Sequence, residues 1–92
     1  MEISFDPVKR GLTLRERGLD FLDAAGVFSG TTFDQEDARF DYAERRFVTI
    51  GRLRDRMVVI VWTPRGDARH VISMRKANER EQTRYEGRLG RP

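Results

Sequence analysis

Cysteine is absent from the 92-residue chain, and histidine occurs once, as His70. The chain therefore has no disulfide framework, no thiolate nucleophile and no zinc finger. A Ser-His-Asp or paired-histidine mechanism needs more convergent residues than the sequence offers. The motifs H-E-x-x-H, G-x-G-x-x-G and G-x-x-x-x-G-K-[ST] are also missing. We expect a protein that holds no metal and needs no cofactor.

Long apolar runs are missing as well, because none approaches the roughly 20 residues that span a bilayer. The first six residues, MEISFD, lack the basic start and the apolar stretch of a signal peptide. We therefore expect a cytoplasmic protein without a membrane partner. The length predicts one domain over residues 1–92 with a small core, so a functional site should lie on an open face.

Lysine is scarce, since only Lys9 and Lys76 among the 18 basic residues are lysine, and the formal net charge is +3. The planar fork of arginine binds phosphate and carboxylate groups, so the composition favours nucleic acid or an acidic protein as partner. Arginine-rich surfaces also arise in GC-rich genomes without such a role. Composition alone leaves both interpretations open.

Three apolar runs, at 47–50, 57–62 and 70–74, are rich in β-branched and aromatic residues and have the length of strands. The connections between them are short, and the second contains Pro64 and Gly66. The pattern predicts an antiparallel three-stranded meander. The nearly unbroken run at 57–62 is typical of a central strand that is covered on both faces.

Arginines mark the corners of this meander, and Arg75 follows its third strand. Strict alternation along that strand places Ser73 and Arg75 on one face. Arg69 and Val71 are predicted on the same face, and the other face should carry His70, Ile72 and Met74.

Local signals predict two helices before the meander and one after it. A short strand is expected at 3–5. Asp6 should cap a first helix that ends at Gly18, and a second helix should follow over 20–29. A final helix is predicted over 78–86, opened by a capping box.

Residues 31–45 form an acidic stretch, predicted as a short strand at 31–33 followed by an exposed loop. Its carboxylates belong to Asp34, Glu36, Asp37, Asp41 and Glu44. Their spacing matches no Ca²⁺-binding loop, so a solvated loop is the better interpretation.

The remaining chemistry is that of arginine. Guanidinium groups are poor bases, but they clamp a phosphate and stabilise the charge that develops on its oxygens. Several of them around one phosphate would let RNA be cleaved by its own 2′-hydroxyl, with His70 or Tyr85 moving protons. The plainer interpretations are a packing role for His70, a core position for Trp62, and solvated turns for Arg52, Arg54 and Arg56.

Six segments together resemble one family. The segments FDPVK (5–9), RGLDF (17–21) and AAGVF (24–28) resemble the front half of BrnT toxins. The segments RFVTIGR (46–52), VVIVWTPRG (58–66) and ISMRKA (72–77) resemble the back half. The resemblance implies an α+β, RelE-like fold, with two N-terminal helices packed on a small twisted antiparallel sheet and a short C-terminal helix.

The resemblance also implies a ribonuclease toxin of a type II toxin–antitoxin pair that inhibits translation. By position, the functional arginines of the family fall on Arg46, Arg65 and Arg75. The family usually has histidine where Arg17 stands and arginine where His70 stands, so His70 is the candidate to replace the missing histidine. We assign catalysis to Arg46, Arg65, Arg75 and His70, and substrate binding to Lys9, Arg17, Arg69, Ser73 and Tyr85.

The implied partners are an RNA substrate and a dimeric, DNA-binding BrnA-like antitoxin. The antitoxin would neutralise the toxin and carry it to operator DNA in an autorepressing complex. The alternative is a catalytically idle binding or co-repressor module that acts only through its antitoxin. Both hypotheses predict a basic face, but only the first predicts turnover of RNA.

Overall fold

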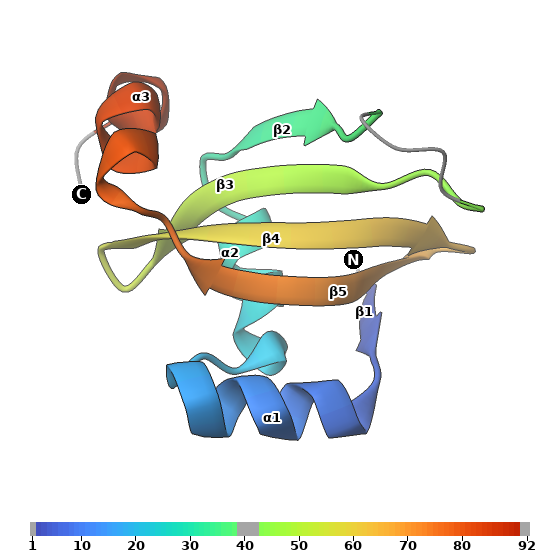
Figure 1. The fold of residues 1–92 in the computed structure, drawn as a ribbon. Coiled ribbons are helices and arrows are strands. Elements are labelled where there is room, and N and C mark those ends of the chain that lie inside the picture. The colour runs from blue at the N-terminus through green and yellow to red at the C-terminus, as the bar shows by residue number, and fades with distance from the viewer. Residues whose placement is uncertain (1, 39–42, 91–92) are drawn as a thin grey trace.

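The computed structural model describes residues 2–38 and 43–90, which form one sheet with helices on both sides (Figure 1). Its elements in order are β1 (Glu2–Phe5), α1 (Pro7–Arg17), the 3₁₀ helix η1 (Phe21–Asp23), α2 (Ala24–Phe28), β2 (Phe33–Glu36), β3 (Phe47–Leu53), β4 (Arg56–Arg65), β5 (Ala68–Lys76) and α3 (Glu79–Leu89).

The sheet has five strands in the order β1-β5-β4-β3-β2, and β1 runs parallel to β5 while the other pairs are antiparallel. The fold is α+β, but the predicted arrangement of two N-terminal helices on a small antiparallel sheet is wrong. The sheet is mixed, it begins before the first helix, and the helices are interspersed between strands. Pairing of β1 joins residues far apart in sequence, and no local pattern reports that kind of contact.

The predicted meander of β3, β4 and β5 is confirmed, with β4 at the centre of the sheet. Val58 and Ile60 belong to a core on one face of β4, and Met57 and Val59 belong to a second core on the other face. The long apolar run of this strand therefore reflects burial on both faces, as expected.

A β-bulge in β5 changes which side chains share a face. Val61 pairs with Ser73 and Trp62 with Val71, so Ile72 is the extra residue. Ser73 and Arg75 do lie on one face, as predicted, but the bulge moves the two earlier residues of that set, Arg69 and Val71, to the opposite face. His70 instead joins Ser73 and Arg75.

Most helix boundaries follow the predicted capping signals. The Asp6 side chain accepts from the Val8 amide to cap α1, and Gly18 ends that helix with a φ of 68°. The predicted second helix is split into η1 and α2. The last helix continues through Gly87 to Leu89, because Leu89 is buried against the sheet and the exposed Gly87 is tolerated.

The acidic stretch contributes a strand further along than predicted. β2 spans Phe33–Glu36 instead of 31–33, and it pairs with the edge of β3. Phe33 anchors the strand through a ring contact of 5.2 Å with Tyr85. Tertiary pairing thus overrides the weak strand propensity of acidic residues. Asp41 lies outside the described residues.

Helix α1 is held mainly by polar contacts, since none of its residues, all of which the structure describes, is buried. Arg10 donates to both carboxylate oxygens of Asp20 at 2.7 and 2.9 Å, which lowers the pKa of Asp20 to about 2. Arg17 Nη1 donates to the carbonyl of Met74 at 2.9 Å. The helix is therefore tied to η1 at one point and to β5 at another.

Two cores lie on the two faces of the sheet. One face, which we call the α2 face, packs against η1 and α2 through Phe21, Val27, Val58, Ile60, Trp62 and Met74, among others. The other, the α3 face, packs against α3 (Figure 1). Gly51 in β3 allows α2 to approach, because a Cβ there would lie 2.7 Å from Val27 Cγ1.

We expect Gly51→Ala to lower the free energy of unfolding by about 1–3 kcal/mol, because the methyl group overpacks a tight contact. Gly11→Ala is the matched control, since nothing lies within 4 Å of a Cβ in that exposed part of α1. The control should stabilise the protein by about 0.5–1 kcal/mol through helix propensity. Denaturant unfolding of both variants measures the difference. If both variants change the free energy of unfolding equally, α2 moves away from the new methyl group at position 51 at little cost.

Candidate functional site

The α3 face is only partly covered in the part of the chain that the structure describes. Helix α3 packs over one end of this face (Figure 1). Strand register places polar side chains toward the other end. Strand register places five of the predicted site residues on this face: Arg46, Arg65, His70, Ser73 and Arg75. We call these five residues the basic row. Arg46 belongs to it because the next residue, Phe47, points to the α2 face and stacks on Trp62 at 4.8 Å.

Register also sets the length of the basic row. His70 pairs with Thr63 and Arg75 pairs with Val59. Four residue steps along β4, or about 14 Å, therefore separate His70 from Arg75, and Arg65 follows two steps beyond Thr63. Val61, opposite Ser73, lies between them on the same face. Positive groups thus stand at both ends of a strip with an apolar centre, which suits a chain of linked phosphates.

His70 is fixed by neighbours from two strands. Its Nδ1 lies 2.9 Å from Ser4 Oγ and 3.5 Å from Arg65 Nη1. Arginine is always a donor, so the contact with Arg65 favours the tautomer with the proton on Nε2. Partial burial lowers the pKa of His70 below 6.5, and the positive charge of Arg65 lowers the pKa further. His70 is therefore largely neutral at pH 7.

Arg75 is clamped by a carboxylate from α3. Its Nη1 donates to Glu81 Oε1 at 2.8 Å, and its Nη2 donates to Glu81 Oε2 at 2.9 Å. These hydrogen bonds raise the pKa of Arg75 and lower the pKa of Glu81. Arg75 side-chain exposure is 45 %, so the guanidinium remains open to solvent on other sides.

A groove of about 710 Å³ runs along the α3 face beside Arg75. Its apolar lining residues are Val48, Ile50, Val59 and Val61 from the sheet. Two cations, Arg75 and Arg84, and three carboxylates, Glu36, Asp37 and Glu81, line it as well. The carboxylate of Glu36 is paired with Arg45 at 3.0 Å, and that of Glu81 is paired with Arg75. An apolar floor next to an arginine suits a nucleobase attached to its phosphate, or an acidic peptide with apolar side chains.

The other predicted substrate-binding residues lie outside the basic row, although Tyr85 lines the groove. Arg69 is on the α2 face, where its guanidinium stacks 4.5 Å from the rings of both Phe28 and Trp62. Arg17 donates a hydrogen bond to the Met74 carbonyl, as described above. Lys9 is exposed on α1, near enough for its charge to lower the pKa of His70. Tyr85 is 9 % exposed and packs on Phe33, which leaves its ring little contact with solvent.

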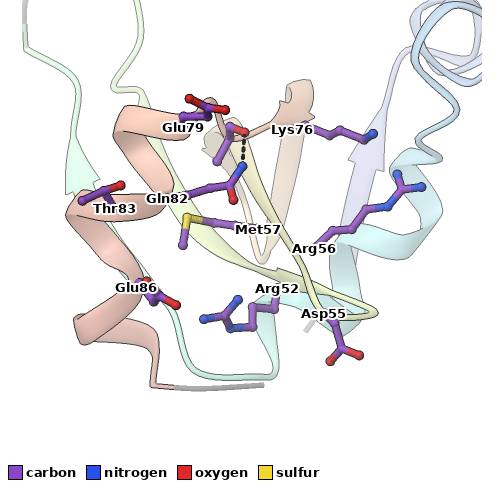
Figure 2. A pocket seen from close by; sticks show the side chains of 10 residues that line it. Arg52, Asp55, Arg56, Met57, Lys76, Glu79, Gln82, Thr83 and Glu86 are labelled. Carbon is purple, nitrogen blue, oxygen red and sulfur yellow. Dashed lines mark hydrogen bonds between the residues drawn. The ribbon is translucent and has the colours of Figure 1, made fainter.

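Figure 2 shows a second hollow, of about 540 Å³, where the turn between β3 and β4 meets α3. It is lined by three cations, Arg52, Arg56 and Lys76, and by three carboxylates, Asp55, Glu79 and Glu86. The charges balance, so this hollow offers no surplus positive charge to a nucleic acid. The residues assigned from the sequence, which all lie in the described ranges, are not among those that line it.

Neither a metal cluster nor a membrane span emerges from the described residues. Over 2–38 and 43–90, no group of three or more His, Cys, Asp or Glu side chains converges as metal ligands would. Within the same ranges, no helix has both the length and the apolar character to cross a membrane.

The family model for the ribonuclease toxin BrnT of type II toxin–antitoxin systems matches residues 5–81. The chain belongs to the BrnT family. No match was found among curated proteins. Membership in the BrnT family makes the chain a ribonuclease toxin, with RNA as substrate and an antitoxin as partner. The family resemblance expected from the six segments is confirmed, and the matched region contains the whole basic row.

Sequence reasoning missed two side chains that hold the site together. Ser4 contacts His70 from β1, and Glu81 clamps Arg75 from α3. The capping box at Asn78 did identify Glu81, but only as a helix-capping residue. Its second role depends on how α3 packs on the sheet, which no local pattern reveals.

Proposed function

We propose that this BrnT-family chain cleaves RNA on the basic row by a metal-independent reaction. The 2′-hydroxyl of the RNA gives its proton to His70 and attacks the adjacent phosphorus. The bond from phosphorus to the 5′-oxygen breaks, and the departing 5′-oxygen takes a proton from water. The products carry a 2′,3′-cyclic phosphate and a 5′-hydroxyl. The observation that carries this proposal is the gathering of Arg46, Arg65, His70 and Arg75 on one partly covered face of the sheet. Family membership supports the coarser statement that the substrate is RNA.

Charge stabilisation is the main contribution of the arginines in this proposal. Arg65 lies 3.5 Å from His70, Arg46 lies across β4 from His70, and Arg75 stands at the far end of the row. Their guanidinium groups bind the phosphate oxygens as negative charge builds up in the transition state. Since Arg46 also forms an ion pair with Glu44 at 3.7 Å, part of its charge is balanced within the protein.

His70 is the proton-transfer group in this proposal. Its lowered pKa leaves it neutral at pH 7, so it has a nitrogen lone pair that can accept the proton of the 2′-hydroxyl. The tautomer that the contact with Arg65 favours carries its proton on Nε2, so the lone pair lies on Nδ1, beside Ser4 Oγ and Arg65 Nη1. Tyr85 is the weaker candidate because it is nearly buried.

The biological setting that we propose follows the family resemblance. The toxin acts on cytoplasmic RNA and thereby inhibits translation. A dimeric, DNA-binding BrnA-like antitoxin neutralises it, and the complex represses its own operon. One observation favours the alternative of a catalytically idle co-repressor: Arg75 is already paired with a carboxylate in the free protein.

Purified protein mixed with RNA in excess EDTA is expected to yield fragments with 5′-hydroxyl ends. The reason is that arginine and histidine side chains supply the whole proposed mechanism. End-labelling of the fragments and gel analysis measure the outcome, and His70→Gln serves as the low-activity control. Activity that EDTA abolishes and Mg²⁺ restores would overturn the mechanism. Absence of cleavage under both conditions would favour the co-repressor alternative.

A further inference from the structure

We propose that Glu81 is a positioning residue for Arg75, which it orients so that one edge of the guanidinium group is free to bind phosphate. This inference rests on the proposed function of the basic row. It adds a residue from α3, outside the sheet, to the machinery of that site. Glu81 does not contact substrate in this proposal, because it acts only through Arg75.

The hydrogen bonds of Arg75 leave one edge of its fork free. Nη1 donates to Glu81 Oε1 and also to the carbonyl of Lys76 at 3.3 Å, so both of its protons are used. Nη2 donates one proton to Glu81 Oε2. The second Nη2 proton and the Nε proton point the same way, and no described residue accepts either of them. That edge offers two parallel N–H donors, the geometry that binds phosphate in a bidentate manner.

Glu81 is itself held in place. Its Oε1 accepts from the Asn78 amide at 2.9 Å, and its own amide donates to Asn78 Oδ1 at 2.8 Å. This capping box fixes the carboxylate at the start of α3, and the side chain of Glu81 is only 22 % exposed. The carboxylate is thus a rigid anchor, and an arginine bound to it loses much of its rotamer freedom before substrate arrives.

Anchoring of Arg75 favours catalysis because the arginine side chain is already ordered before the substrate binds. A free arginine side chain has many rotamers, and restricting them on substrate binding costs affinity. Arg75 lines the groove beside the apolar floor, so an oriented free edge meets a phosphate whose base lies on that floor. The geometric requirement is strict, because small errors in the placement of a charge-stabilising group reduce the rate strongly.

Two substitutions distinguish the positioning of Arg75 by Glu81 from the capping of α3. Glu81→Gln keeps a side chain that completes the capping box but removes the carboxylate charge that holds Arg75. Asn78→Ala removes the cap residue and leaves the Arg75–Glu81 pair intact. We expect Glu81→Gln to lower kcat by at least about tenfold with little change in Tm. Asn78→Ala should lower Tm but change kcat much less.

A third variant tests whether Glu81 acts through Arg75. If it does, the double variant Arg75→Ala/Glu81→Gln should cleave RNA no more slowly than Arg75→Ala alone. Additive losses would overturn the inference, because they would show an independent role for Glu81. Faster cleavage by Glu81→Gln would also overturn it, since the carboxylate would then compete with phosphate.

A readout that needs no cleavage keeps this inference separate from the proposed function. The ¹⁵N order parameter of Arg75 Nε reports the rigidity of the side chain on the fast timescale. We expect a high value in the wild-type protein and a lower one in Glu81→Gln, with Asn78→Ala close to wild type. Equal values in wild type and Glu81→Gln would overturn the inference even if RNA is cleaved. If the wild type does not cleave RNA, the proposed function fails, whatever the order parameters show.

Discussion

Arg75→Ala is expected to lower RNA cleavage by about 10²–10³-fold and to abolish toxicity while the protein stays folded. In the proposed mechanism the guanidinium supplies charge stabilisation at one end of the basic row, and alanine removes it entirely. Stability should change by no more than about 1 kcal/mol, because the side chain is 45 % exposed and its ion pair with Glu81 is screened by solvent. Glu81 keeps its hydrogen bond to the Asn78 amide in the variant.

Arg80→Ala is the matched control for this experiment, since it removes the same charge from an exposed position of α3. It should leave cleavage within about twofold of wild type, as expected for a surface charge away from the site. Arg75→Lys should recover little activity. The single ammonium group of lysine cannot form one pair of parallel hydrogen bonds to Glu81 and a second pair to a phosphate. Growth after induction, cleavage of purified RNA and thermal unfolding are the three measurements. A folded Arg75→Ala protein with full toxicity would remove Arg75 from the site.

Binding of the antitoxin is expected to expel RNA from the toxin completely. The groove and the basic row lie on one face, so a partner segment with acidic and apolar side chains would occupy both. The carboxylates of this segment would bind the guanidinium groups of the basic row, and its apolar side chains would cover the floor of the groove at Val48 and Val61. Trp62 is not one of the anchors, because it is only 8 % exposed and its Nε1 donates to Thr49, which confirms its predicted core position.

A competition experiment measures whether the antitoxin displaces bound RNA. Antitoxin is titrated into toxin bound to a fluorescent RNA whose attacking 2′-hydroxyl is replaced by hydrogen, and release of the RNA is followed by anisotropy. Association of the two proteins should slow as salt rises, because the attraction acts between exposed charges. Arg80→Ala again serves as the control for loss of a charge elsewhere. A ternary complex that still holds RNA at full affinity would show that the antitoxin inhibits from another surface.

Local patterns predicted the meander and the helix caps well. The run of β-branched residues in β4 and the capping residues Asp6 and Asn78 all act over short distances in the chain. Such signals depend on backbone geometry that neighbouring residues set, so they are visible in the sequence.

The face of each side chain in β5 was harder to predict. A single bulge at Ile72 shifts the alternation, and it decides whether His70 lies with Arg75 or on the opposite face. Nothing in the run HVISM marks that position, because a bulge is selected by the partner strand and by the cores on both faces. The short strand expected at 3–5 is confirmed as β1, but its pairing with β5 was not predicted. That pairing and the hydrogen bonds between Glu81 and Arg75 depend on contacts between distant segments.

The pairing of β1 with β5 has a consequence for how the toxin is made. Glu2 lies opposite Ala68 and Phe5 lies opposite Val71, so β1 must wait for a strand that leaves the ribosome 66 residues later. Pairing across such a long stretch of chain is slow compared with the formation of a hairpin. Until β5 emerges, Ser4 has no His70 to contact, and Arg75 has not yet been joined to the chain. A partly synthesised toxin should therefore be unable to cleave the messenger that encodes it.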